Sequence, residues 1–143
     1  NRQKGYIKAL QDAGLKADKS IVLHNSLTRK DGENAVRKLL MIDPLPDAIF
    51  CANDTTALSA IIHLRKKKIR VPEDIAIVGF SNEPFSEVVT PSITTIKQPG
   101  FEMGQKAAQL LIDQINQKKG PFIFQNIKMP TELIVRDSSV IRN

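Results

Sequence analysis

Apolar residues along this chain either recur every three or four positions or gather in short runs bounded by turn residues. The first pattern is typical of helices that bury one face, and the second is typical of strands. Helical spacing marks residues 2–13, 34–42 and 102–117. Short runs of aliphatic or β-branched residues predict strands at residues 21–23 and 131–135, and a strand or an extended crossover at residues 92–98.

Residues 46–82 are the most informative stretch, because a segment with helical spacing separates two apolar runs there. The runs, residues 48–51 and 75–80, each end in polar residues. Two buried strands joined by a helix form a parallel pair, because a parallel return needs a crossover connection. In parallel sheets, ligands bind just beyond the carboxyl ends of the strands. The polar residues that we expect at this rim, facing a crevice for a polar small molecule, are Asn53, Asp54, Ser81 and Asn82.

The alternation of helices and strands predicts an α/β fold with a parallel-rich open sheet and helices on both faces. Residues 83–88 are expected to form a short helix or turn, and the tail beyond Ser138 is expected to be loose. The chain opens directly on a helix, whereas doubly wound folds usually begin with a strand. We therefore expect the sequence to start inside a larger fold.

The composition is that of one ordinary globular domain: 143 residues, 41% hydrophobic and 25% charged. No apolar run approaches the ~20 residues that span a bilayer, so we expect no membrane partner. A single cysteine excludes a disulfide framework within the chain. We interpret Cys51 as a small hydrophobic residue of the core.

The net charge of +6 could favour an anionic partner, but much of the basic excess lies at the ends of two expected helices. These clusters, residues 65–68 and 118–119, are typical of solvated helix C-termini. The chain has no Trp, one Tyr, and no visible helix-turn-helix, zinc-binding spacing or RNA-binding aromatic motif. We do not expect this chain to bind nucleic acid directly.

The sequence offers little for catalysis. A Ser-His-acid set could be assembled from Ser81, His63 and Asp54, but the G-x-S-x-G turn that exposes a nucleophilic serine is absent. Glycine-rich loops that cradle phosphates are absent too. His24 and His63 lack metal-ligand spacing, and we expect both to be surface or structural residues. The sequence therefore predicts neither an enzyme nor a cofactor or metal site.

Five short motifs occur in order along nearly the whole chain. They read R-x-x-G-Y-x-x-A-L-x-x-A-G from Arg2, P-D-A-I-F-x-x-N-D from Pro46, V-P-E-D-I-A-I-V-G-F from Val71, P-S-I-T-T-I-x-Q-P from Pro91 and L-I-V-R-D-S from Leu133. Together they resemble the lactose-repressor (LacI/GalR) family of bacterial transcription regulators, in the region that follows the DNA-binding headpiece.

This resemblance implies a two-lobed core like that of periplasmic sugar-binding proteins. Residues 1–97 would form the C-terminal lobe, residues 98–126 the crossover and a helix of the N-terminal lobe, and residues 127–143 the return strand and tail of the C-terminal lobe. The parent protein would act in the bacterial cytoplasm and contact DNA only through an N-terminal headpiece, which this sequence lacks. A periplasmic sugar- or solute-binding protein of the same fold is the alternative, and it predicts an export signal.

The partner implied by the resemblance is a small polar effector between the lobes, a sugar or a related molecule. The family's arginine falls on Arg2, whose guanidinium can donate to sugar hydroxyls or to a carboxylate. The family's asparagine–aspartate pair falls on Asn53 and Asp54. We expect Asn53 to contact the ligand and Asp54 to be the N-cap of the following helix.

Four further positions enter the implied ligand site. Ser81 stands where the family usually has an aspartate, so the firm grip of a carboxylate on two hydroxyls is missing. Asn82 is a candidate to compensate for that loss. Gln98 matches a crossover position that touches the effector in some members. Leu27 falls near a position where several members stack an aromatic ring on the ligand.

The family also dimerises through this lobe, by surfaces that correspond to residues 55–68 and 84–89. The apolar residues expected in the homodimer interface are Leu58, Ile62, Phe85, Val88 and Val89. Apolar residues flanked by charge are consistent with a surface patch that a partner buries. Ordinary core packing is the alternative for these side chains.

Overall fold

The computed structural model describes residues 2–24, 26–116 and 124–140, and its helices and strands alternate as the sequence predicts. The α-helices are α1 (Arg2–Asp12), α2 (Arg29–Leu39), α3 (Asp54–Lys66), α4 (Phe85–Val88) and α5 (Gly100–Asn116). The strands are β1 (Ala48–Phe50), β2 (Ala76–Val78), β3 (Thr95–Lys97) and β4 (Glu132–Ile134). Two short 3₁₀ turns complete the fold, η1 (Lys19–Ile21) and η2 (Asp137–Ser139).

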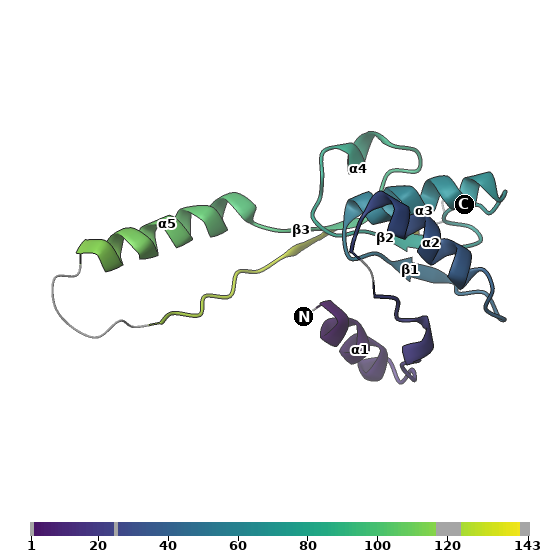
Figure 1. The fold of residues 1–143 in the computed structure, drawn as a ribbon, viewed down its shortest axis with the longest axis horizontal. Helices are drawn as coiled ribbons and strands as arrows, with labels where there is room; N and C mark the ends of the chain where they lie inside the picture. The colour runs from purple at the N-terminus through teal and green to yellow at the C-terminus, as the bar shows by residue number, and fades with distance from the viewer. Residues whose placement is uncertain (1, 25, 117–123, 141–143) are drawn as a thin grey trace.

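The sheet confirms the parallel pair that the sequence predicts. Strands β1 and β2 run parallel, with Ile49 opposite Ile77. Strand β3 pairs antiparallel with β4, and single parallel bridges such as Val78 to Thr94 tie β3 to β2. Figure 1 shows α3 on one side of β1 and β2 and α1 on the other. The α/β fold with helices on both faces is therefore confirmed.

Helix α3 supplies much of the hydrophobic core, because its apolar positions face the sheet on one side and α2 on the other. The buried core residues are Val36, Cys51, Ala57, Ala60, Ile61, Leu64, Ile75, Ile77 and Ile93. Helices α2 and α3 approach closely at Gly32, where a Cβ atom would lie 2.6 Å from the carbonyl oxygen of Thr56. Burial raises the pKa of the Cys51 thiol to about 12, as desolvation of a thiolate requires.

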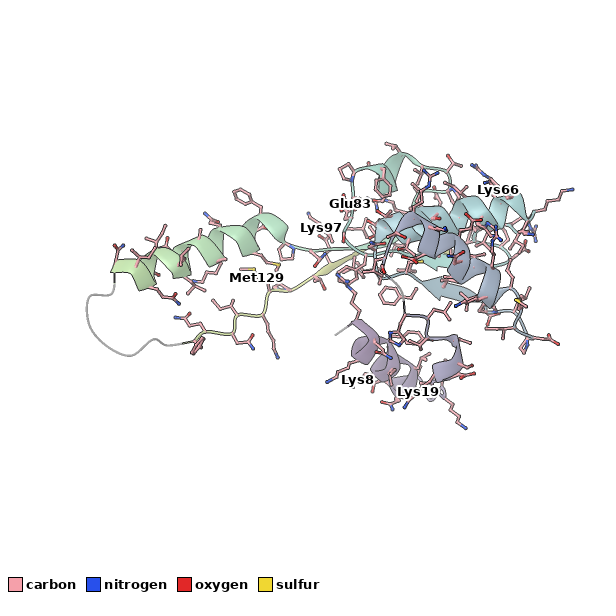
Figure 2. All side chains as sticks on the ribbon, viewed as in Figure 1. Lys8, Lys19, Lys66, Glu83, Lys97 and Met129 are labelled. Atoms are coloured by element: carbon pink, nitrogen blue, oxygen red, sulfur yellow. The ribbon has the colours of Figure 1, made fainter. Side chains whose placement is uncertain are left out.

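Helix α5 leaves this α/β body, and the chain returns to it through β4 (Figure 1). No residue of α5 is buried. Its expected apolar stripe is open, since Met103, Leu111 and Ile115 are 49%, 58% and 73% exposed. Figure 2 shows Met129 of the returning segment beside α5, and a shallow cavity of about 420 Å³ lies between the two. None of the helices in the described ranges is long and apolar enough to cross a bilayer.

Two local predictions are wrong at the N-terminal side. Residues 21–23 form no strand, because the Asp18 side chain accepts from the Ser20 N–H and starts the 3₁₀ turn η1. Helix α2 begins at Arg29, five residues before the predicted start at residue 34, because Thr28 and Asp31 form a capping box. The Thr28 backbone N–H donates to Asp31 at 2.8 Å and lowers the pKa of that carboxyl.

The chain is held firmly at Ser138, the residue beyond which the loose tail is predicted. Ser138 is fully buried, and its hydroxyl donates to the Ile77 carbonyl at 2.6 Å and accepts from the Thr94 N–H at 2.8 Å. These bonds fasten Ser138 to β2 and to the segment before β3. The basic pair at residues 118–119, the end of the predicted helix at residue 117 and the last three residues of the tail lie outside the described residues.

Candidate functional site

Three parts of the chain converge on Phe80, just beyond the carboxyl end of β2. The backbone N–H of Asp54 donates to the Phe80 carbonyl at 3.1 Å and places the start of α3 there. The Arg2 guanidinium carbon lies 4.0 Å from the centroid of the Phe80 ring, a cation–π contact that brings the start of α1 to the same place. Ser81 follows directly. The structure thus forms the rim that the sequence predicts, and Arg2 belongs to it.

Asn53 is the N-cap of α3, whereas the sequence assigned that role to Asp54. Asn53 has an extended backbone with φ −153° and ψ 167°, and its side-chain oxygen accepts from the Thr56 N–H at 2.8 Å. Asp54 is already the first helical residue, so it is placed too late to cap. The Asn53 amide nitrogen donates to the Leu27 carbonyl at 3.0 Å, so both ends of this amide are used within the protein.

Asp54 is fully buried beneath the rim. One of its oxygens accepts from the Thr95 hydroxyl at 2.6 Å, and the other accepts from the Glu83 N–H at 2.8 Å. Gly79 makes room for this carboxylate, because a Cβ atom there would lie 2.1 Å from the Asp54 oxygen. Asp54 therefore joins α3, β3 and the loop before α4, and its oxygens do not face the crevice.

Ser81 and Gln98 meet at the rim, although they come from different strands. The Gln98 side-chain nitrogen donates to the Ser81 hydroxyl at 3.3 Å. The Ser81 backbone N–H donates to the Ile96 carbonyl at 2.9 Å and continues the pairing of β2 with β3. Ser81 and Asn82 have positive φ values of 119° and 55°, a turn conformation that carries the loop away from the strand.

Asn82 faces the protein rather than an open crevice. Its side-chain oxygen accepts from Arg136 at 3.0 Å, and its backbone N–H donates to the Thr95 hydroxyl at 3.2 Å. Arg136 also donates to the Ser86 hydroxyl at 3.2 Å and to the Ile93 carbonyl at 2.9 Å. Sequence reasoning missed both Thr95 and Arg136. Arg136 stands in the L-I-V-R-D-S motif, but nothing local indicates its distant partners.

The chain is similar in sequence to a known family and to several known proteins. Residues 1–139 match the family model for the periplasmic binding protein-like domain. The chain belongs to this family. The repressor PurR of Pasteurella multocida is 40% identical over 137 residues, and the repressor CytR of Escherichia coli K12 is 34% identical over 139 residues. Each alignment covers 96% of this chain and 40% of the relative, so the chain spans about two fifths of their length.

A solved structure of a transcriptional regulator is also similar to this chain. The complex of the transcriptional regulator CelR with cellobiose matches with a TM-score of 0.89 and 36% identity, over 96% of this chain and 42% of that one. The resemblance to the effector-binding region of LacI-type regulators is therefore confirmed. The named relatives are repressors and a regulator, which favours that class over the periplasmic solute-binding alternative.

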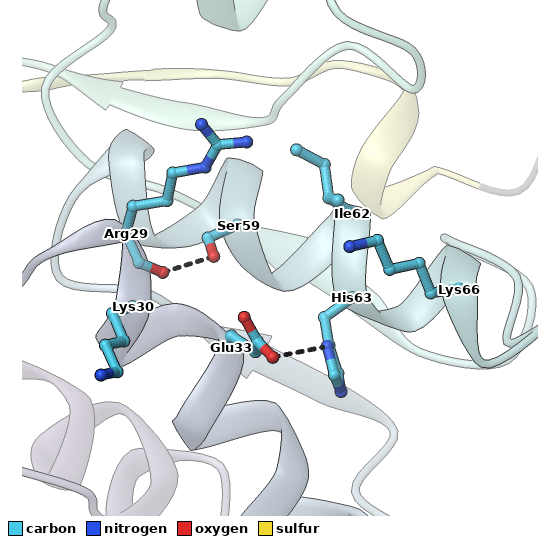
Figure 3. Close-up of a pocket in the computed structure, with 7 residues that line it drawn as sticks. All are labelled: Arg29, Lys30, Glu33, Ser59, Ile62, His63 and Lys66. Carbon is cyan, nitrogen blue, oxygen red and sulfur yellow. Dashed lines mark hydrogen bonds and ion pairs between the residues drawn. The ribbon is translucent and has the colours of Figure 1, made fainter.

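Besides the cavity beside α5, which Gln98 lines, two cavities lie in the α/β body. One, of about 310 Å³, lies between α1 and β1, and Arg2 and Leu27 of the predicted ligand residues line it. The other, of about 340 Å³, lies between α2 and α3 (Figure 3). Its lining residues are Arg29, Lys30, Glu33, Ser59, Ile62, His63 and Lys66. No predicted ligand residue lines the second cavity, so we place the candidate effector site at the rim.

Some of the side chains that line the α2–α3 cavity make contacts within the protein. The Ser59 hydroxyl donates to the Arg29 carbonyl, and Glu33 lies 2.5 Å from Arg37 and 3.8 Å from His63. The hydrogen bond from Arg37 is the main cause that lowers the pKa of Glu33. Of the two histidines, His63 is buried and His24 is exposed. No three His, Cys, Asp or Glu side chains in the described part of the chain cluster as a metal site would require.

The predicted dimer surface divides into exposed and packed residues. Val88 of α4 is 80% exposed, so it is the open apolar side chain of this surface. Leu58, Phe85 and Val89 are half-buried and pack against the core. Ile62 is half-buried and lines the α2–α3 cavity. Phe85 and Val89 thus fit the core-packing alternative, whereas Val88 is open to a partner, and the dimer interface itself stays a prediction.

Proposed function

We propose that this chain is the effector-binding and dimerising part of a bacterial transcription regulator of the LacI type. The observation that carries the proposal is the Gln98–Ser81 contact. Gln98 directly follows β3, at the point where the chain leaves the α/β body for α5. Ser81 lies in the loop that follows β2, at the rim. A ligand that touches this pair touches the rim and the crossover at once.

The proposed mechanism is a shift between two arrangements of the lobes. We assign residues 1–97 and 127–143 to one lobe and residues 98–126 to the other. The open apolar face of α5, which includes Met103 and Ile115, supports this division, because a surface of that kind is normally covered in a folded protein. An effector that binds better to one lobe angle shifts the population toward it, and that angle sets the spacing of distant DNA-binding headpieces.

The effector class that we propose is a small polar molecule of the saccharide kind or a derivative of one. The CelR structure holds cellobiose, and its region of similarity covers the rim of this chain. Groups for such a ligand are Arg2, Ser81 and Gln98, which the structure brings to one rim. Asn53 and Leu27 are joined to each other beside it. Asp54 and Asn82 stabilise the loop next to the site through hydrogen bonds within the protein.

The full-length regulator that we propose acts in the cytoplasm as a homodimer, contacts DNA through its headpiece and catalyses no reaction. The relatives named above are HTH-type transcriptional repressors, which supports a role in transcription regulation rather than in catalysis. The dimer contact would include Val88, the open apolar residue of α4.

A thermal-shift screen of the full-length protein against sugars, sugar derivatives and nucleosides tests the proposal. At least one compound is expected to raise the melting temperature. Gln98→Ala should reduce that rise, because it removes the group that links the rim to the crossover. Lys66→Ala, in the α2–α3 cavity, is the matched control and should leave the rise unchanged. A rise that Lys66→Ala abolishes and Gln98→Ala does not would move the effector site away from the rim.

A further inference from the structure

The carboxylate beneath the rim, Asp54, is unable to accept hydrogen bonds from a ligand. A neutral saccharide presents many hydroxyl donors, and carboxylate acceptors bind them most firmly. Asp54 is fully buried, and both of its oxygens already accept from Thr95 and Glu83. The other position that faces the rim from the end of β2 is Ser81, whose hydroxyl carries no charge.

The amide oxygens beside the rim are occupied as well. The Asn53 oxygen accepts from both the backbone N–H and the hydroxyl of Thr56. The Asn82 oxygen accepts from the Arg136 guanidinium. Ligand hydroxyls therefore find these two acceptors already used by donors of the protein.

Of the three groups proposed to contact the ligand, Arg2, Ser81 and Gln98, the charged one is the Arg2 cation. Its guanidinium stacks on the Phe80 ring, which occupies one face of the group and leaves its N–H edges free to donate. Among the described residues, Arg2 has no carboxylate within ion-pair distance. A guanidinium with free edges matches the geometry of a carboxylate or a phosphate, because both offer two oxygens in one plane.

We infer that the effector of this rim carries an anionic group, a phosphate or a carboxylate, that binds Arg2, while its neutral part contacts Ser81 and Gln98. This inference rests on the proposed function and narrows its ligand class. The uncharged Ser81 favours such a ligand, because a carboxylate at that position would lie beside the anionic group and repel it.

Matched ligand pairs test the inference on the full-length protein by thermal shift and calorimetric titration. The neutral members are ribose, glucose, galactose and adenosine. Their anionic partners are ribose 5-phosphate, glucose 6-phosphate, galacturonate and adenosine monophosphate. At least one anionic compound is expected to bind at least about tenfold more tightly than its neutral partner, and its affinity should fall as salt screens the charge. The phosphate and uronate arms distinguish the two possible anions.

Two substitutions sharpen the test. Ser81→Asp should weaken the binding of the anionic ligand by about tenfold or more. Ser81→Asn introduces a side chain of nearly the same shape as Asp but without its charge, so it should weaken binding much less. Arg2→Gln removes the cation from an exposed helix start and should abolish the preference for the anionic member, while Arg2→Lys should retain part of it. The melting temperature without ligand shows whether each variant is folded.

The outcomes separate the two claims. A neutral compound that binds as tightly as its anionic partner, or Ser81→Asp with unchanged anion affinity in a folded protein, would overturn the inference and leave the proposed function standing. A panel in which neither class binds contradicts both the inference and the proposed small-molecule site.

Discussion

Replacing Asp54 by alanine probes the contact that joins the rim to the crossover strand. The substitution leaves two buried donors, the Thr95 hydroxyl and the Glu83 N–H, without their acceptor. Each unmet buried donor costs about 1–3 kcal/mol, so the free energy of unfolding should fall by about 2–6 kcal/mol. Asp54→Asn is the matched control. Its oxygen can accept from Glu83 while its nitrogen donates to the Thr95 hydroxyl, so the loss should stay below about 2 kcal/mol.

Urea-induced unfolding of the full-length protein, followed by circular dichroism, measures these differences. Thr95→Val removes the same contact from the other side. In the double variant with Asp54→Ala, the two losses should therefore overlap by about 1 kcal/mol or more. Asp54→Ala with a loss below about 1 kcal/mol, or additive losses in the double variant, would refute the buried contact.

Four further predictions concern single residues. Asn53→Ala should lower the free energy of unfolding by about 1 kcal/mol in urea titrations because it removes the α3 N-cap, and Asn53→Asp, which keeps the acceptor, should lose less. Val88→Asp should give a monomer in light scattering, and an unchanged dimer mass would remove α4 from the interface. Cys51, whose pKa burial raises to about 12, should resist a thiol reagent at about pH 8 until urea unfolds the protein, and rapid labelling of the folded protein would contradict its burial. The hydrogen bonds from Arg70 lower the Asp74 pKa to about 2, so the stability that Asp74 contributes should be present above its ordinary value of 3.8 and be lost as the pH falls toward 2. When the stability of Asp74→Asn is measured as the pH is lowered, this loss should be absent. If the variant loses stability over the same pH range as the unmodified protein, other groups are responsible for the loss.

The strand–helix–strand unit could be predicted from sequence because its signals are local and strong. The apolar runs at residues 48–51 and 75–80 became β1 and β2, and helical spacing marked α3 between them. The start of α2 was missed because its first turn is polar and depends on the side-chain bonds between Thr28 and Asp31. Apolar periodicity carries no information about such bonds.

The rim was predicted more successfully than the roles of its residues. Its location follows from strand direction, which the sequence pattern indicates. Asn53 caps α3 through Thr56, which is only three positions away, but the buried role of Asp54 depends on Thr95, which lies 41 positions beyond it. The hydrogen bond from Arg136 to Asn82 joins residues that are 54 positions apart. Contacts across such distances leave no periodic trace in one sequence, so the structure was needed to show which polar groups remain available to a ligand.

Hydrogen exchange of the full-length protein, with and without a compound that raises its melting temperature, tests the central claim most directly. We predict added protection in residues 79–83 and 95–98, where the loop after β2 meets the crossover. The segments of α2 and α3 that line the other cavity should exchange as before. Protection confined to α2 and α3, with the rim unchanged, would contradict an effector site at the ends of the parallel strands.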